Sequence, residues 1–313
     1  MVFRSCLFSC FVQDFLPHMQ NNAAFKFLIK FSQALVQYLE LFIYFIIITF
    51  FSFVYAFSDF LLTLIQNLPI IKEAFFRPYR KDVYSMVQEL TIKSLLDLSH
   101  TLAAPLLQKF QYPWEALDGI DSFILALGPT LSKEEYEQRG ENIWIAKSAK
   151  IYPNNYIAGP CIIGPETEVR PGAFIRKDAL VGSHCVVGNS TELKNVILFD
   201  NVQVPHYNYV GDSILGFHSH MGAGSITSNV KSDKTLVVVH GPQAIPTGRK
   251  KFGAILGDRV EVGCNSVLNP GTVIGRDSNV YPVSCVRGFI PQNSIFKCAD
   301  HIVKKHAEDS AHV

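Results

Sequence analysis

The sequence has almost no surplus of charge, because 28 Lys and Arg side chains are balanced by 27 Asp and Glu side chains. A nucleic-acid-binding protein needs basic side chains collected on one face, so this balance argues against that class. The seven cysteines include no CxxC pair and no framework spacing. These absences exclude the common zinc-finger and disulfide-scaffold patterns and indicate a reducing compartment. We therefore expect a cytoplasmic protein.

Charge is missing altogether from one segment near the N-terminus. Leu41 to Ser58 holds eighteen residues without a charged side chain, and FLLTLIQ follows the single acid Asp59. Crossing a bilayer takes about 20 apolar residues, so one interpretation of the hydrophobic extension 1–85 is a membrane helix over about 41–65. The other is upstream sequence read through an early start codon, with Met86 as the true start. The basic cluster that follows the segment favours the C-terminal part on the inside.

Residues 86–142 have the pattern of a helical lead-in. SLLDLSHTLAAPLLQKF and WEALDGIDSFILALG place apolar residues at three- and four-residue steps, and Pro113 breaks the pattern between them. We expect short amphipathic helices that cover one end of the next domain.

From Ile145 the spacing of apolar residues changes to six, with a small residue four places after most of them. A hexapeptide repeat of this kind is typical of a parallel β-helix, in which three units close a coil of eighteen residues. The chain is therefore predicted to be mainly β, a left-handed parallel β-helix over 143–298 after an α-helical N-terminal region. IFKCADHIVKKHAE, which leads into the tail 299–313, is expected to be a short helix over the other end. The repeated aliphatic positions are Ile145, Ile151, Ile157, Ile163, Val169, Ile175, Val181, Val187 and Leu193, then Leu215 and Met221, then Leu256, Val262, Leu268, Ile274, Val280 and Val286.

Two stretches break this count. One extends from Lys194 to Tyr209, and the other from Val230 to Gly253 with three basic residues in a row. An excursion from a regular coil costs conformational entropy and adds no core, so we expect both to be loops that carry function. Cys161 and Cys185 fall at the small inward position and are expected to be structural.

The motifs around these breaks resemble a known family. VGNSTELKNV, VPHYNYVGDS and MGAGSITSNV closely resemble the acetyltransferase half of the bifunctional N-acetylglucosamine-1-phosphate uridyltransferase/glucosamine-1-phosphate acetyltransferase. They resemble even more closely the archaeal-type sugar-1-phosphate nucleotidylyltransferase/acetyltransferases, which have a GRRKLG-like stretch where this chain has GRKKFG. The likeness covers about residues 143–298. It implies a homotrimeric N-acetyltransferase that moves acetyl from acetyl-CoA to the amine of a hexosamine 1-phosphate, feeding UDP-N-acetylglucosamine or related nucleotide-sugar synthesis, without a metal.

The resemblance also assigns roles to individual residues. The catalytic pair would be His206, the general base, and Ala223, whose backbone N–H steadies the thioester oxyanion. The groups that hold the sugar and its phosphate would be Arg170, Lys194, Tyr209 and Asn229. The candidates for binding CoA are Cys264, Pro282, Arg249, Lys250 and Lys251, although a solvated charge cluster is the commoner explanation of the three basic residues. The chain departs from the family at His220, where an asparagine is expected, and at Pro282, where an alanine is expected.

Elementary chemistry supports the same roles. Acetyl transfer needs a base near pH 7, and histidine is the side chain whose ordinary pKa suits that task. A backbone N–H at the glycine-flanked turn Gly222-Ala223-Gly224 can donate to an oxyanion, an effect worth about 3 kcal/mol. Arg170 and Lys194 suit a sugar phosphate because guanidinium and ammonium groups pair with phosphate oxygens.

Other functions stay open on the sequence alone. A nucleotidylyltransferase would need an LxxGxGTR-type phosphate loop near its start, and residues 1–140 contain none and are too few for that fold. The alternative function is therefore a pyrophosphorylase-related protein without its nucleotidylyltransferase domain, acting on another amino sugar or as a non-catalytic scaffold. A γ-class carbonic anhydrase uses three zinc-binding histidines. His184 and His220 are 36 residues apart, two coils of eighteen, but the third position is Ser225, so we expect no metal.

Overall fold

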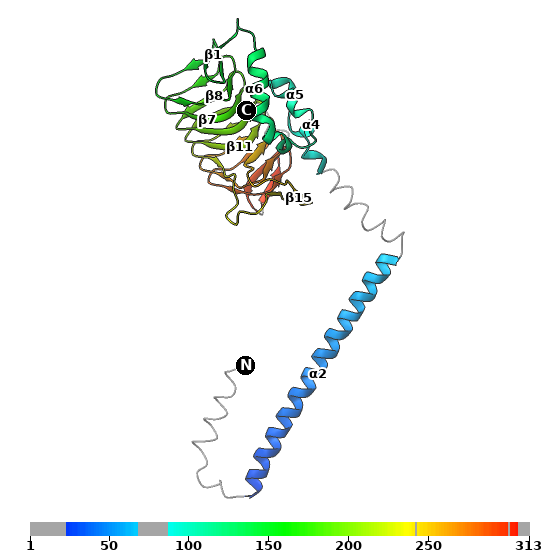
Figure 1. Cartoon of the computed structure of the whole chain (residues 1–313). Coiled ribbons are helices and arrows are strands. Elements are labelled where there is room, and N and C mark those ends of the chain that lie inside the picture. Colours follow the sequence, from blue (N-terminus) through cyan, green and yellow to red (C-terminus); the bar gives the residue numbers. More distant parts are fainter. Residues whose placement is uncertain (1–22, 68–86, 242, 300, 306–313) are drawn as a thin grey trace. The chain divides into compact units, whose positions relative to one another are not determined.

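The computed structural model describes residues 23–67, 87–241, 243–299 and 301–305, which fall into two compact units, one before and one after residue 79. In the first unit these residues form the single helix α2 (Ala23–Asn67), blue in Figure 1. Within α2, Lys30–Val54 has a mean hydropathy of 2.0 over an exposed span of 25 residues. At 1.5 Å per residue it is about 37 Å long, enough to cross a bilayer core of about 30 Å. This span begins earlier than the expected 41–65, and the alternative start at Met86 lies outside the described residues.

In the second unit the chain winds into stacked coils with three flat walls, and the predicted parallel β-helix is confirmed (Figure 1). Wall A contains β2 (Ile143–Ala146), β5 (Cys161–Ile163), the C-terminal halves of β7 (Phe174–Val181), β9 (Glu192–Leu198) and β11 (Tyr209–Leu215), then β16 (Ala254–Leu256), β19 (Thr272–Ile274) and β22 (Phe289–Ile290). Wall B contains β3 (Lys150–Ile151), β6 (Glu168–Val169), β8 (Val186–Asn189), β10 (Gln203–His206), β12 (His220–Met221), β17 (Glu261–Val262), β20 (Asn279–Val280) and β23 (Ser294–Cys298). Wall C contains β4 (Tyr156–Ile157), the N-terminal halves of β7, β9 and β11, then β13 (Ile226–Thr227), β18 (Val267–Leu268) and β21 (Cys285–Val286).

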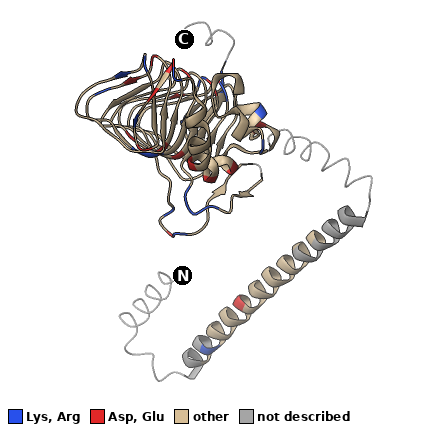
Figure 2. Ribbon diagram, turned by 45° about the horizontal axis from the view of Figure 1, so that its top comes forward, with Lys and Arg blue, Asp and Glu red and all other residues tan. Residues whose placement is uncertain are grey.

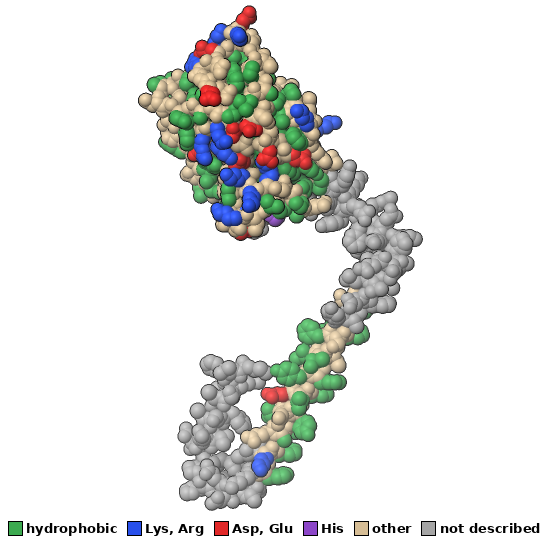
Figure 3. Space-filling model, in the orientation of Figure 1, with side chains coloured by type: hydrophobic (Ala, Val, Ile, Leu, Met, Phe, Trp, Pro, Cys, Tyr) green, Lys and Arg blue, Asp and Glu red, His purple; other side chains and the backbone are tan. Residues whose placement is uncertain are grey.

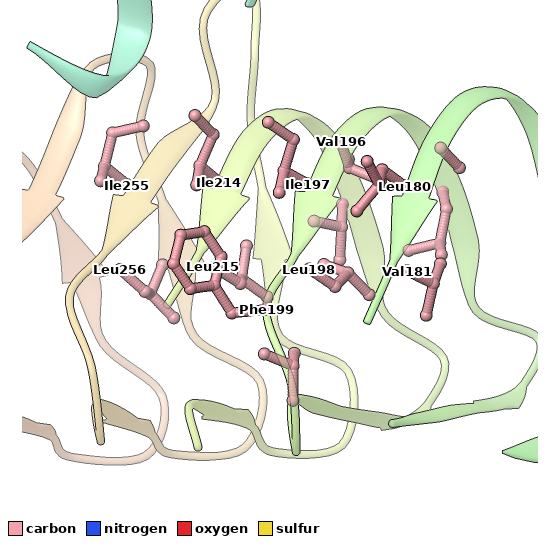
Figure 4. Close-up of a cluster of buried hydrophobic side chains, with 14 of the residues drawn as sticks. Leu180, Val181, Val196, Ile197, Leu198, Phe199, Ile214, Leu215, Ile255 and Leu256 are labelled. Carbon is pink, nitrogen blue, oxygen red and sulfur yellow. The ribbon is translucent and has the colours of Figure 1, made fainter. Parts of the chain in front are cut away.

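The repeated aliphatic side chains point into the coils and stack on one another. Figure 4 shows such a stack on wall A, where Val181, Leu198, Leu215 and Leu256 are each fully buried. Each contributes about 1.5–3 kcal/mol of burial free energy, which is why one side-chain class recurs at this position. Cys161 and Cys185 are buried in the same interior, as expected, and burial raises the pKa of both thiols to about 12.

The first break in the count is not an excursion, and that prediction is wrong. On wall A, Ile163 pairs with Val181 eighteen residues later, but Val181 pairs with Leu198 and Leu198 with Leu215, seventeen residues later in each case. The register changes between Ile175 and Lys177, where Arg176 bulges. The coils over 194–209 are therefore regular but one residue shorter, so a strict repeat of six residues no longer matches the sequence there.

The second break is a true insertion, defined here as residues 230–253. Ile214 pairs with Ile255, so these paired positions on neighbouring strands of wall A are forty-one residues apart in the sequence. Part of this length forms an antiparallel pair, β14 (Val238–Val239) with β15 (Ile245–Pro246). The loop projects from the coils below the other strands in Figure 2.

The helical lead-in lies along one flank of the coils, not over their end as expected. α6 (Ile120–Leu127) packs on β7 and β9, and η2 (Pro113–Gly119) packs on β11. Backbone N–H groups of Asp200 and Asp258 donate to His100 O and Leu95 O, each at 3.0 Å. These short helices cover wall A, and three of them have a proline at their first or second position. They are α4 (Ile92–Leu95), η1 (Leu98–His100), α5 (Ala104–Leu107), η2 (Pro113–Gly119), α6 (Ile120–Leu127) and η3 (Gly128–Thr130).

Antiparallel strands terminate the coils at both ends. β1 (Tyr136–Gly140) pairs with β2, and β24 (His301–Lys304) pairs with β23. The helix expected over IFKCADHIVKKHAE is therefore wrong for its described residues. Phe296 continues the inward column of wall B by pairing with Val280, and this burial outweighs the helical pattern.

Candidate active site

His206 belongs to the wall itself and not to a loop above it. It is the last residue of β10 and pairs with Asn189 of β8, while its side chain is exposed. The coil then turns through Tyr207, which adopts a φ of +49°, into wall C. The loop expected between Lys194 and Tyr209 is thus, at this point, a regular corner between walls B and C, and the imidazole projects from that corner.

Three other predicted residues lie at the same corner on the following coils. Gly224 N–H donates to His206 O at 2.9 Å, Asn265 N–H to Ala223 O at 2.8 Å, and Val283 N–H to Cys264 O at 2.8 Å. Met221, Val262 and Val280 are paired across neighbouring strands, which places the residues two positions later in one line. We call His206, Ala223, Cys264 and Pro282 the corner row. Its successive members are about 5 Å apart along the coil axis.

The turn that contains Ala223 leaves a donor at the surface. Gly224 has a φ of +72°, the left-handed region, and a β carbon there would collide with the Asn265 side chain. Ala223 is half-buried, and within the described part of the chain its N–H has no hydrogen-bond acceptor. A donor of this kind, one coil from an imidazole, can stabilise charge on a bound carbonyl oxygen.

A buried amide that the sequence reasoning missed holds these two coils together. Asn208 is 2 % exposed, and its Nδ2 donates to Gly222 O at 2.9 Å and to Ser225 O at 3.1 Å. Its Oδ1 accepts from His206 N–H at 3.1 Å. The position of His206 relative to the Ala223 turn is therefore fixed. The sequence did contain a signal for Asn208, because the asparagine of VPHYNY is a polar residue next to a position that faces the interior of the coil.

Three of the four predicted substrate residues meet around a carboxylate, Asp212, that sequence reasoning also missed. Lys194 Nζ lies 2.8 Å from Asp212 Oδ1, and Asn229 Nδ2 lies 2.5 Å from Asp212 Oδ2 and 3.2 Å from the Tyr209 hydroxyl oxygen. Asn195 Nδ2 also donates to Asp212 Oδ1, at 2.9 Å. We call Lys194, Asn195, Tyr209, Asp212 and Asn229 the acidic network. Its Asp212 side chain is only 3 % exposed.

Tyr209 links the acidic network to His206, three residues away around the corner. It pairs with Glu192 on the preceding coil, and Glu192 binds Arg176 at 3.1 Å. Burial raises the pKa of Tyr209, and the negative charges of Glu192 and Asp212 raise it further. Its hydroxyl therefore stays protonated at neutral pH and can donate a hydrogen bond.

Arg170 lies apart from the acidic network. Its guanidinium binds Glu168 Oε2 through Nε at 3.3 Å and Nη2 at 3.2 Å. Val169, Val187 and Val204 are paired in sequence across wall B, so Arg170 is in line with Pro205, the residue before His206, and lies two coils earlier. That separation is about 10 Å along the axis.

The residues predicted to bind CoA divide into two places. Cys264 and Pro282 line a cleft of about 330 Å³ with His220, Glu261 and Tyr281. In that cleft His220 Nδ1 lies 2.8 Å from Glu261 Oε2. The histidine at position 220, where the resemblance predicts an asparagine, thus forms a hydrogen-bonded imidazole–carboxylate pair with Glu261.

The basic run of the insertion is elsewhere. Arg249 binds both carboxylate oxygens of Asp118, at 2.6 and 2.5 Å, and its side chain is only 11 % exposed. Lys250 and Lys251 are exposed. The residue that follows them, Phe252, donates its N–H to Asn229 O at 3.0 Å, so the run lies on the side of the acidic network.

The spacing of His184 and His220 suggested a carbonic anhydrase, but the two histidines do not align in the structure because the coils between them are shorter than eighteen residues. His220 pairs with Gln203, and Gln203 with Val186, so His184 is two positions out of line with His220. Among the described residues no group of three or more His, Cys, Asp or Glu side chains could hold a metal ion.

Comparisons with known proteins identify relatives of the β-helix part of this chain. The family model of the GMPPB C-terminal domain matches residues 157–295. The chain is 34% identical to the bifunctional protein GlmU of Methanococcus aeolicus over 183 residues, 52% of this chain and 44% of the relative. It is 27% identical to the bifunctional sugar-1-phosphate nucleotidylyltransferase/acetyltransferase of Sulfurisphaera tokodaii over 190 residues, 59% of this chain and 47% of the relative. The chain thus covers less than half of either relative.

A solved structure also matches. The perosamine N-acetyltransferase from Caulobacter crescentus, in complex with CoA and GDP-perosamine, is 18% identical with a TM-score of 0.28, over 52% of this chain and 56% of that one. A likeness this distant carries no argument about function. The sequence relatives confirm the predicted resemblance to hexapeptide acetyltransferases.

Proposed function

We propose that this protein is an N-acetyltransferase that moves acetyl from acetyl-CoA to the amine of a hexosamine 1-phosphate, feeding UDP-N-acetylglucosamine or related nucleotide-sugar synthesis. One observation carries the proposal. An exposed imidazole and a backbone N–H without an acceptor among the described residues lie on adjacent coils at one corner, and a cluster of polar side chains begins three residues further along.

The reaction needs a neutral amine, a base and an oxyanion donor. The amine nitrogen attacks the thioester carbonyl carbon, the nitrogen–carbon bond forms, and the amine proton passes to His206. The Ala223 N–H donates to the carbonyl oxygen as it gains charge. The carbon–sulfur bond then breaks, and CoA leaves as the thiol after taking that proton back from His206.

The acceptor sugar is assigned to the acidic network. Tyr209 and Asn229 offer a hydroxyl and an amide to sugar hydroxyls, and Lys194 offers its ammonium next to them. Arg170 is assigned to the phosphate, which would have to displace Glu168 from the guanidinium. The arrangement supports a small polar acceptor, because each of these groups is fixed by a neighbour before a ligand binds.

The thioester arm of CoA is assigned to the corner row. Cys264 and Pro282 continue the line from Ala223 and line the 330 Å³ cleft, so an extended chain can follow them along the axis. Lys250 and Lys251 remain candidates for its phosphates. Arg249 is a poorer one, because its guanidinium already binds Asp118.

We also propose a homotrimer and a cytoplasmic β-helix unit tethered through α2. Large exposed aromatic side chains near the corner, Tyr156, Phe174 and Tyr207, suit a contact with a second copy. Size-exclusion chromatography with light scattering tests the trimer. Alkaline carbonate extraction of native membranes tests the anchor, which is refuted if the whole protein leaves the pellet.

The central test is CoA release by the full chain with glucosamine 1-phosphate, galactosamine 1-phosphate and a nucleotide-linked amino sugar. Loss of a general base costs about 10²–10⁴ in rate, so His206→Ala should lower kcat by that factor, whereas Arg170→Ala should chiefly raise KM. His301→Ala, an exposed histidine on β24, is the matched control. No turnover with any acceptor would favour a non-catalytic, pyrophosphorylase-related scaffold.

A further inference from the structure

A second cleft lies between the insertion and the last coils, outside the residues assigned above. Its volume is about 250 Å³. Its lining combines two permanent cations, an imidazole, two hydroxyls and an amide from three separate chain segments. These residues are Ser228, Lys231, Ser232, His240, Asn269 and Arg287.

The walls of this cleft are a fixed part of the fold. Phe289 N–H donates to His240 O at 2.7 Å, and Val237 and Val239 of the insertion are fully buried. Gly288 permits this close approach, because it has a φ of +80° and a β carbon there would lie 2.5 Å from His240 O. The insertion is therefore docked on the coils, and the cleft does not depend on a ligand to form.

Positive charge dominates the cleft. Arg287 has no carboxylate within ion-pair distance among the described residues. Lys231 Nζ lies 2.6 Å from Thr235 Oγ1 and 3.3 Å from Asp233 Oδ2, and Asp233 is the single carboxylate in the lining. Figure 2 shows Lys and Arg positions on the projecting loop, and Figure 3 shows basic side chains gathered over the lower part of this unit.

The cleft continues the line of the acidic network toward the C-terminal coils. Thr227 pairs with Leu268 and Leu268 with Val286, so Ser228, Asn269 and Arg287 follow one another on successive coils. Ser228 precedes Asn229, whose amide belongs to the acidic network. In that network and at Arg170 the cations already bind carboxylates, Lys194 with Asp212 and Arg170 with Glu168. Within the part of the chain that the structure describes, Arg287 has no such partner.

We propose that this cleft is a phosphate-binding subsite that takes a phosphate monoester or diphosphate of one of the two substrates. Phosphate oxygens accept hydrogen bonds from guanidinium, ammonium and hydroxyl groups, and a charge-assisted bond to Arg is about twice as strong as a neutral one. The source of the phosphate depends on the proposed acetyl transfer, but anion binding itself does not.

Direct binding tests the subsite without any turnover. Inorganic pyrophosphate is titrated calorimetrically into the full chain at low ionic strength. Arg287→Ala should weaken its affinity about 10-fold or more, as expected for a lost charge-assisted contact. Arg287→Lys should retain part of the affinity. Arg139→Ala, which removes an exposed arginine of β1, is the control and should change nothing.

Kinetics then identify the source. If Arg287→Ala raises KM for glucosamine 1-phosphate but not for glucosamine, the subsite holds the acceptor phosphate. If it raises KM for acetyl-CoA but not for acetyl-dephospho-CoA, the subsite holds the 3′-phosphate of the donor. Pyrophosphate affinity that falls in a chain without acetyltransferase activity would support the subsite and reject the proposed function. No pyrophosphate binding to the unaltered chain, or affinities and KM values within 2-fold for Arg287→Ala, would overturn the subsite.

Discussion

Asp212 should be the most sensitive single position of the acidic network. Its side chain is 3 % exposed and binds Lys194, Asn195 and Asn229. Asp212→Ala leaves the Lys194 ammonium, itself 14 % exposed, without a counter-charge. Removing one partner of a buried pair costs about 3–5 kcal/mol, and we expect the lower value because Lys194 keeps some access to water.

The assay is thermal unfolding of the full chain followed by near-ultraviolet circular dichroism. For a unit of this size, 1 kcal/mol shifts Tm by about 2–4 °C, so Asp212→Ala should lower Tm by about 6–12 °C. The matched control is Asp277→Ala. Asp277 also forms a short ion pair, with Arg259, but its side chain is 44 % exposed, and such surface pairs contribute about 0–1 kcal/mol.

A double variant separates the orphaned charge from the lost hydrogen bonds. Adding Lys194→Met to Asp212→Ala removes the uncompensated ammonium, so most of the lost Tm should return. Activity should not return, because Asn229 has lost Asp212, one of its two acceptors, and Lys194 is gone. The reasoning is refuted if Asp212→Ala destabilises the protein no more than Asp277→Ala does.

Two further predictions concern the thiols and the insertion. At pH 8 an alkylating reagent should modify the exposed Cys264, and acetyl-CoA should slow that reaction. Cys161 and Cys185 should react only after unfolding, because burial raises their pKa values to about 12. Mass spectrometry of the peptides measures the labelling, and labelling of Cys264 that acetyl-CoA does not affect would contradict the proposed binding of CoA along the corner row. Gly288→Ala should undock the insertion and speed tryptic cleavage within it. Gly248→Ala, equally left-handed at φ +70° but with open space around it, should not, and equal cleavage rates would contradict the docking.

The residues of the repeat and the motifs could be read from the sequence. Each inward position of a coil must be filled by a side chain that stacks on its equivalents, so the aliphatic spacing alone required a β-helix. His206 and Ala223 were identifiable because their motifs are local. The two clefts could not be identified, because their walls come from segments that are distant in sequence.

Register was decided only by the tertiary structure. A single bulge at Arg176 shortens the following coils to seventeen residues, which brings His206 into line with Ala223 and moves His184 out of line with His220. Asp212 gave no local signal, since Lys194 and Asn229 lie eighteen and seventeen residues away and meet it only when coils stack. The helical lead-in shows the same limit. Its apolar stripe required a buried face, but which surface it would cover depended on wall A already being assembled.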